Sequence, residues 1–224
     1  MEDLLSYSIS DFLMYSPEIY YRLLARYNEA IWPLHFVALI LSFVVIGLIY
    51  RPKQWSGLAV GVIVAAGWLW AAIVYFQSYY ATISWAAPYF SGLFVFEALL
   101  LIVGVVSGRL SFTDRPYGIR LIGLALFVGI PLLVPGLAIV EGREMAMEEM
   151  VWLTPDATVL ATCSLLLAAS RSHWLLYLAP ATWAILRGAL LWAMESPSWW
   201  LMPLVMGVTV AGALYRRYSP HWAR

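Results

Sequence analysis

The stretch SGLFVFEALLLIVGVVSG, residues 91–108, is a nearly unbroken apolar run that carries one carboxylate, Glu97, near its middle. A helix of roughly 20 apolar residues is long enough to cross the hydrocarbon core of a bilayer. An ionisable group at that depth is costly unless it faces the protein interior, a partner or a water-filled path. The stretch therefore predicts a membrane helix, and Glu97 needs a polar neighbour.

The composition of the whole chain agrees with this prediction. Of the 224 residues, 63% are hydrophobic and only 12% are charged, whereas soluble domains are about half apolar and a quarter charged. Thirteen basic residues balance thirteen acidic ones, so no excess charge indicates nucleic-acid binding. The single cysteine, Cys163, excludes an internal disulfide framework and a CxxC metal site. We expect an all-α integral membrane protein without a metal or cofactor.

Seven segments approach the length of a membrane crossing, and the fifth is the shortest. They are residues 31–50, 55–76, 88–106, 118–140, 154–170, 174–194 and 199–215. The prediction is a seven-helix domain at 31–216, preceded by an amphipathic segment at 1–30 and followed by a short basic tail at 217–224. No room remains for a separate soluble domain, so any activity lies within the bundle or at its ends.

Basic residues in the connections predict the orientation, because cytoplasmic loops carry the excess of Lys and Arg. Alternate connections and the tail contain Arg51, Lys53, Arg109, Arg115, Arg120, Arg171, Arg216, Arg217 and Arg224. The other connections contain only Arg143 as a base and are rich in acids. This asymmetry places the N-terminus outside and the C-terminus inside.

The leading segment contains a helix start at Ser16, with a first-turn proline at Pro17. Four apolar or aromatic side chains then recur on one helical face: Tyr20, Leu23, Leu24 and Tyr27. That pattern is typical of a helix lying in the membrane interface. A helix packed over the mouth of the bundle would have the same pattern.

Two features predict how the helices pack. Gly57, Gly61 and Ala65 recur every four residues, and such a small-residue stripe allows another helix to approach closely. Pro131 and Pro135 lie one turn apart, and each removes a backbone donor. We expect a break or kink there, either as a binding feature of the kind seen in transporters or as an ordinary packing kink.

The charged residues inside the predicted spans suggest a polar site. Counting along the helices places Glu97 and Arg187 at similar depth, and a charge-neutralising pair would solve the burial problem of both. Asp156 is the alternative partner for Arg187. Together with His35 and Glu29, Asp156 falls in the outer half of the membrane, which predicts a polar pocket open to the outside.

These observations favour two functions. The first is binding or transport of a small solute or ion through the outer pocket, and the alternative is a structural or accessory subunit of a larger membrane complex. An enzyme ranks third, because no nucleophile with its base, phosphate loop or zinc helix is visible. The expected partners are the lipid bilayer, an unidentified small solute and either other membrane chains or a second copy, but no nucleic acid.

The segments YNEAIWPLHFVAL, RPKQWSG, SGLFVFEALLL and WLTPDATVLATCSLLL together resemble a bacterial family of multi-pass membrane proteins classified only as a domain of unknown function. The resemblance extends over nearly the whole chain. It implies a multi-pass protein of the bacterial inner membrane and brings no assigned activity, substrate or catalytic residue. An acid at Glu97 and an arginine at Arg187 are not constant features of that pattern.

Overall fold

The computed structural model describes residues 15–114, 117–140 and 144–218, with the backbone alone for 131–140 and for residue 145. Every named element in these residues is a helix. The long helices are α1 (Pro17–Ala30), α2 (Leu34–Tyr50), α3 (Ser56–Trp70), α4 (Ala87–Val106), α5 (Ile119–Val140), α6 (Pro155–Ala168), α7 (Leu178–Ala193) and α8 (Leu201–Tyr218). A π-helix, η3 (Ala71–Tyr79), continues α3, and short 3₁₀ turns follow at η4 (Tyr80–Thr82), η5 (Met145–Met147) and η6 (Trp174–Tyr177).

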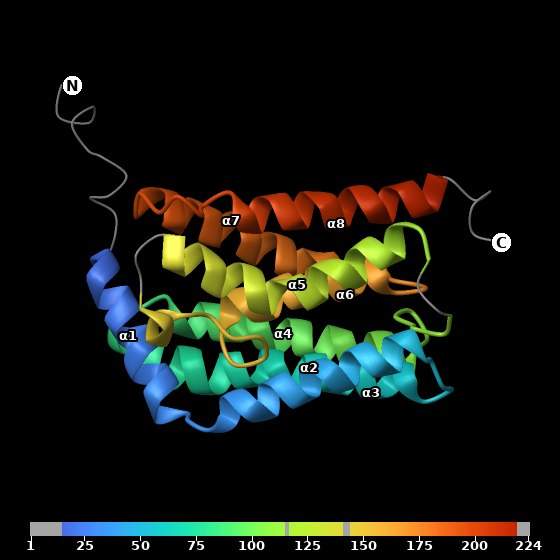
Figure 1. Cartoon of the computed structure of the whole chain (residues 1–224), viewed down its shortest axis with the longest axis horizontal. Coiled ribbons are helices and arrows are strands. Elements are labelled where there is room, and N and C mark those ends of the chain that lie inside the picture. Colours follow the sequence, from blue (N-terminus) through green and yellow to red (C-terminus); the bar gives the residue numbers. More distant parts are fainter. Residues whose placement is uncertain (1–14, 115–116, 141–143, 219–224) are drawn as a thin grey trace.

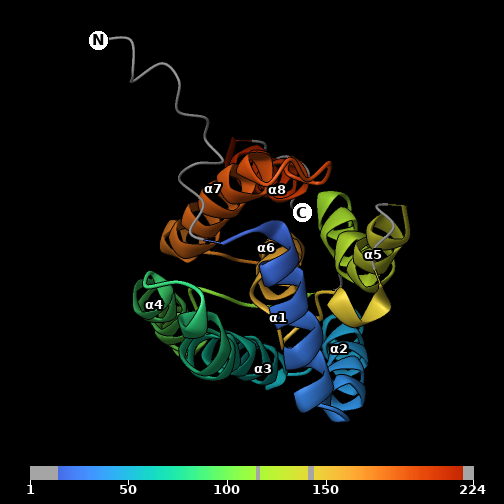
Figure 2. The ribbon, with the colours of Figure 1, turned by 90° about the vertical axis from the view of Figure 1, so that its left-hand side faces the viewer.

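Helices α2 to α8 run alongside one another, and α1 lies across one end of the bundle (Figure 1). Viewed from that end, α6 lies in the middle and the other helices surround it (Figure 2). Each span predicted from the sequence coincides with one of the helices from α2 to α8. The positions of the helices were therefore predictable, although coincidence with a helix does not establish a membrane crossing.

Three helical segments in the described part are long and apolar enough to cross a membrane: Ser56–Thr82, Ala87–Val106 and Trp174–Ala193. A fourth is obtained if α1 and α2, which bend by 86° at their junction, form one broken span. The structure thus supports an all-helical protein with three or four candidate spans, fewer than the seven predicted. One reason is that α6 has only 14 residues, which corresponds to a length of about 21 Å.

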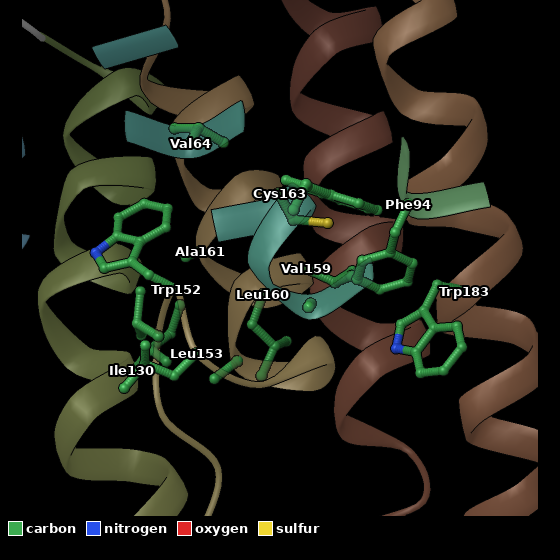
Figure 3. Close-up of a cluster of buried hydrophobic side chains, with 14 of the residues drawn as sticks. Val64, Phe94, Ile130, Trp152, Leu153, Val159, Leu160, Ala161, Cys163 and Trp183 are labelled. Atoms are coloured by element: carbon green, nitrogen blue, oxygen red, sulfur yellow. The ribbon is translucent and has the colours of Figure 1, made fainter. Parts of the chain in front are cut away.

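Helix α6 is buried along its entire length, and this explains its uniformly apolar sequence. All of its residues from Pro155 to Ala168 are buried, as expected for a helix that is hydrophobic on every face. Its side chains Val159, Leu160 and Cys163 lie between two aromatic groups, with Trp152 on one side and Phe94 on the other (Figure 3).

Two arginines bind the C-terminal end of α6. The guanidinium of Arg120 donates to the carbonyl of Ala168 at 3.1 Å. Arg216 donates to the carbonyls of Ala169 at 2.5 Å and Leu166 at 3.1 Å. These carbonyls have no partner within the helix, and cations are stabilising at a helix C-terminus. Both arginines belong to the set that the sequence assigned to the cytoplasmic connections and tail.

Helix α1 begins where the sequence predicted, with Ser16 at the N-cap and Pro17 in the first turn. Its buried residues include the predicted face, Tyr20, Leu23, Leu24 and Tyr27, and also Asn28. The hydroxyl of Tyr27 donates to the carbonyl of Leu153 at 2.5 Å and accepts from the indole of Trp70 at 2.7 Å. Packing over the mouth of the bundle therefore accounts for this face.

The small-residue stripe of α3 meets α4. A Cβ added to Gly61 would overlap the side chain of Val105, and one added to Gly57 would lie 3.7 Å from the backbone nitrogen of Phe112. Ala65 is 2% exposed. These are the positions that the sequence assigned to helix packing.

Helix α5 runs continuously from Ile119 to Val140 through Pro131 and Pro135. The predicted break of the helix is therefore wrong. A proline in a helix removes one backbone hydrogen bond without necessarily ending the helix, since neighbouring groups can satisfy the freed carbonyl. The side chains of residues 131–140, and with them any role of the two prolines in binding, lie outside the described residues.

Candidate functional site

The candidate site is a group of five side chains at the end of the bundle that α1 covers. We call Tyr20, Glu149, Asp156, Trp183 and Arg187 the arginine cluster. Arg187 of α7 is 4% exposed. Its Nε atom is hydrogen-bonded to Oδ2 of Asp156, the second residue of α6. The other carboxylate oxygen of Asp156 accepts from the indole of Trp183 at 2.9 Å.

Tyr20 connects Arg187 to the loop before α6. Nη2 of Arg187 donates to the hydroxyl of Tyr20 at 2.6 Å, and that hydroxyl donates to Oε1 of Glu149 at 2.8 Å. The guanidinium carbon lies 4.4 Å from the centre of the Tyr20 ring, within cation–π distance. Nη2 of Arg187 is also 4.0 Å from Oε1 of Glu149. One arginine therefore links α1, the loop, α6 and α7.

Local sequence explains why these groups meet. Thr154 caps the loop by accepting from the backbone nitrogen of Met150 at 2.8 Å, and Pro155 then starts α6. This turn leaves Asp156 in the first turn of α6, where an acid is stabilised by the helix dipole. The buried face of α1 places Tyr20 over it.

Two spaces adjoin the cluster. A cavity of about 60 Å³ is lined by Tyr20, Glu149, Asp156, Arg187 and neighbouring apolar side chains of α6, α7 and α8. One water needs roughly 10–15 Å³ by this measure, so the cavity can hold a few waters or a small ion. A groove of about 720 Å³ runs between α1, the start of α2 and the loop. Glu148 and Glu149 line both spaces.

Glu149 is the titrating group of the cluster. Burial and the negative charge of Asp156 raise the pKa of Glu149 to about 7, although Arg187 and the hydrogen bond from Tyr20 oppose the shift. Burial also raises the pKa of Tyr20 well above its ordinary value, so its hydroxyl stays protonated and available as a donor. Glu149 therefore exchanges its proton near neutral pH.

The predicted ion pair between Glu97 and Arg187 is wrong. Glu97 is 0% exposed, and neither carboxyl oxygen has a hydrogen-bond partner among the described residues. Arg187 instead binds Asp156, the alternative partner. Equal depth along two helices was a poor guide because it ignored the loop and α1, which bring Glu149 and Tyr20 into contact with the guanidinium.

The predicted outer pocket is divided between the two spaces. Asp156 lines the cavity, whereas Glu29 and His35 line the groove. Glu149 joins the two spaces, but the sequence singled it out only as one of several acids in a loop. Tyr20 was assigned to the apolar face of α1 without a polar role. The only sequence signal for either residue was an acid-rich loop beside a buried arginine.

The described residues contain no group of three or more His, Cys, Asp or Glu side chains that could hold a metal ion. The fold and site thus define an all-helical bundle with a buried acid–arginine–tyrosine network under a covering helix. A model described as a family of unknown function, DUF6064, matches residues 17–221, and the chain belongs to this family. No curated protein and no solved structure matches the chain.

Proposed function

We propose that the protein is a polytopic protein of the bacterial inner membrane that binds or moves a small solute or ion. In this proposal α2 to α8 cross the bilayer seven times, with the N-terminus outside. The polar pocket formed by the arginine cluster and its adjoining groove is the binding region. It faces outward, beneath α1.

Two observations support membrane insertion. Large apolar side chains are exposed on the outward faces of several helices, for example Phe43 at 65%, Leu99 at 60% and Ile185 at 69%. Exposed apolar surface of this kind favours contact with lipid or with another membrane chain. The connections that carry Arg51, Lys53 and Arg171 all lie at the end opposite α1 (Figure 1), in agreement with a cytoplasmic basic end.

The observation that carries the binding function is a cavity lined by charged groups rather than filled by side chains. Arg187 balances only one of the two carboxylates that approach it, Asp156 and Glu149. When both are ionised the cluster has a net negative charge, which favours a proton or small cation over an anion. A pKa of about 7 at Glu149 suits proton exchange coupled to such binding.

One observation favours the alternative, an accessory subunit. All the Arg187 contacts described above are internal, and Glu97 does not line the cavity. A fully engaged arginine can be only an interhelical tie. The two functions differ in whether Glu149 affects anything besides stability.

The test is ion flux into proteoliposomes. We expect protein-dependent flux of protons or small cations, measured with a pH-sensitive dye and with a potassium gradient, to change several-fold in Glu149→Gln. The matched control is Glu144→Gln, because Glu144 is exposed in the same loop and lines neither space. If the parent and both variants are equally impermeable although correctly folded, transport is excluded and the accessory subunit is favoured.

A further inference from the structure

The groove between α1 and the loop contains buried hydrogen-bond acceptors without partners. Asn28 is 8% exposed, and its Oδ1 has no hydrogen-bond partner among the described residues. The same holds for Nδ1 of His35 and Oε2 of Glu149. All three residues line the groove. Because most buried polar atoms in proteins are paired, this concentration around one space indicates a missing donor.

The orientation of the Asn28 amide is fixed by its contacts. Its Nδ2 donates to the backbone carbonyls of Ala146 at 2.9 Å and Glu148 at 2.8 Å. Both amide hydrogens are therefore used, and a flipped amide would place its oxygen against two carbonyl oxygens. Oδ1 is thus an acceptor by construction.

The charge of the groove favours a cationic donor. Glu29, Glu148 and Glu149 line it, and Arg26 is the one basic side chain among its described lining residues. Trp32 also lines the groove and is 62% exposed. A carboxylate-rich groove with an exposed aromatic ring attracts ammonium groups.

We propose that this groove binds a primary ammonium group, whose N–H donors reach Asn28, His35 and Glu149 while Glu29 neutralises its charge. The group belongs either to a free organic amine or to the headgroup of an ethanolamine lipid, because the groove lies at the end of the bundle beside the exposed side chain of Phe36. The inference rests on the proposed binding function and names the chemistry of its ligand. It does not require transport.

Thermal unfolding of the purified protein in nanodiscs of phosphatidylglycerol and phosphatidylcholine tests the inference. Ethylammonium chloride should raise the melting temperature, whereas tetramethylammonium chloride at the same ionic strength should not, since it has the charge but no N–H donor. His35→Phe and Glu29→Gln should each weaken the apparent affinity about tenfold, which corresponds to about 1.4 kcal/mol. Glu144→Gln should leave the affinity unchanged.

A second arm replaces phosphatidylcholine by phosphatidylethanolamine without added amine. Stabilisation by this lipid that is lost in His35→Phe, with no response to ethylammonium, identifies the lipid headgroup as the source of the ammonium. A response to ethylammonium identifies a free amine. If neither probe stabilises the parent, or tetramethylammonium stabilises it equally, the inference is overturned. Ion flux that depends on Glu149 would survive that result, so failure of the inference and failure of the proposed function are distinguishable.

Discussion

Arg187 shows how a buried charge can be accommodated without an isolated pair. Its guanidinium binds the carboxylate of Asp156, the hydroxyl of Tyr20 and the face of the Tyr20 ring. Removing one partner of a buried ion pair leaves the other charge uncompensated, whereas removing both leaves neither. The coupling between Arg187 and Asp156 should therefore be large.

We predict that Arg187→Met and Asp156→Asn each cost on the order of 3–5 kcal/mol of stability, and that the double variant costs much less than their sum. The cycle is measured by reversible unfolding in detergent. Glu97→Gln with Arg187→Met is the control cycle and should be additive, because Glu97 has no hydrogen bond to Arg187. Strong coupling in the control cycle together with additivity in the first would contradict the described cluster.

Glu149 gives a pH dependence whose sign follows from its raised pKa. With a pKa of about 7 in the folded protein and near 4.5 otherwise, the native state binds the extra proton between these values. The stability of the parent should therefore fall as the pH rises from about 4.5 to about 7. Asp156, Arg187 and Tyr20 face Glu149 in both protein and variant, so Glu149→Gln removes only this titration.

The expected difference between parent and Glu149→Gln is on the order of 2 kcal/mol, since each unit of pKa shift corresponds to about 1.4 kcal/mol. The variant should gain stability relative to the parent between pH 5 and pH 8, as measured by chemical unfolding at each pH. Parallel curves for the two proteins would mean that Glu149 titrates normally.

At this scale the sequence identified Arg187, Asp156, Glu29 and His35 but not how they are joined. Their depth could be counted along helices, but which helix faces another depends on packing that a single sequence does not specify. Glu149 could not have been chosen over its neighbour Glu148, because only the fold of the loop distinguishes them.

Among the elements, α6 has the most demanding environment. It is covered on all sides, its first turn carries Asp156, and its last carbonyls bind Arg120 and Arg216. Helix α5 approaches it at Gly123, where an added Cβ would lie 2.5 Å from the backbone nitrogen of Ala168 and 2.6 Å from the carbonyl oxygen of Ser164. Backbone atoms cannot move aside as a flexible side chain can.

We therefore predict that Gly123→Ala destabilises the protein by roughly 1–3 kcal/mol through overpacking. The matched control is Gly92→Ala in α4, because nothing lies within 4 Å of its added Cβ. The control should be neutral or stabilising by up to about 1 kcal/mol, the helix propensity gained. Equal effects of the two substitutions on the melting temperature would show that α5 and α6 are not in close contact.

Element boundaries were the most predictable feature. The fifth predicted span, 154–170, is α6 within two residues at each end, because Thr154 and Pro155 give a clear helix start. The central position of α6 was not predicted. Its all-apolar surface has the same appearance whether lipid or protein surrounds it.

For the whole molecule, the account assigns opposite environments to the two ends of the bundle. Basic connections gather at one end, and the arginine cluster lies at the other under α1 (Figure 1). Three or four candidate spans follow from length and hydropathy, whereas the basic residues in alternate connections favour seven. The difference concerns mainly α5 and α6, which are counted as shorter apolar helices.

Cysteine accessibility in intact cells decides between these numbers and tests the central claim most directly. In a Cys163→Ser background, cysteines at Ser78 and Glu144 should react with a membrane-impermeant thiol reagent, and cysteines at Gln54 and Arg171 should react only after the cells are opened. All four positions are exposed. If α5 and α6 do not cross, the cysteine at position 144 is protected in intact cells while that at position 78 reacts. That result, or labelling at positions 54 and 171 in intact cells, would contradict a seven-span protein with its polar pocket facing outward.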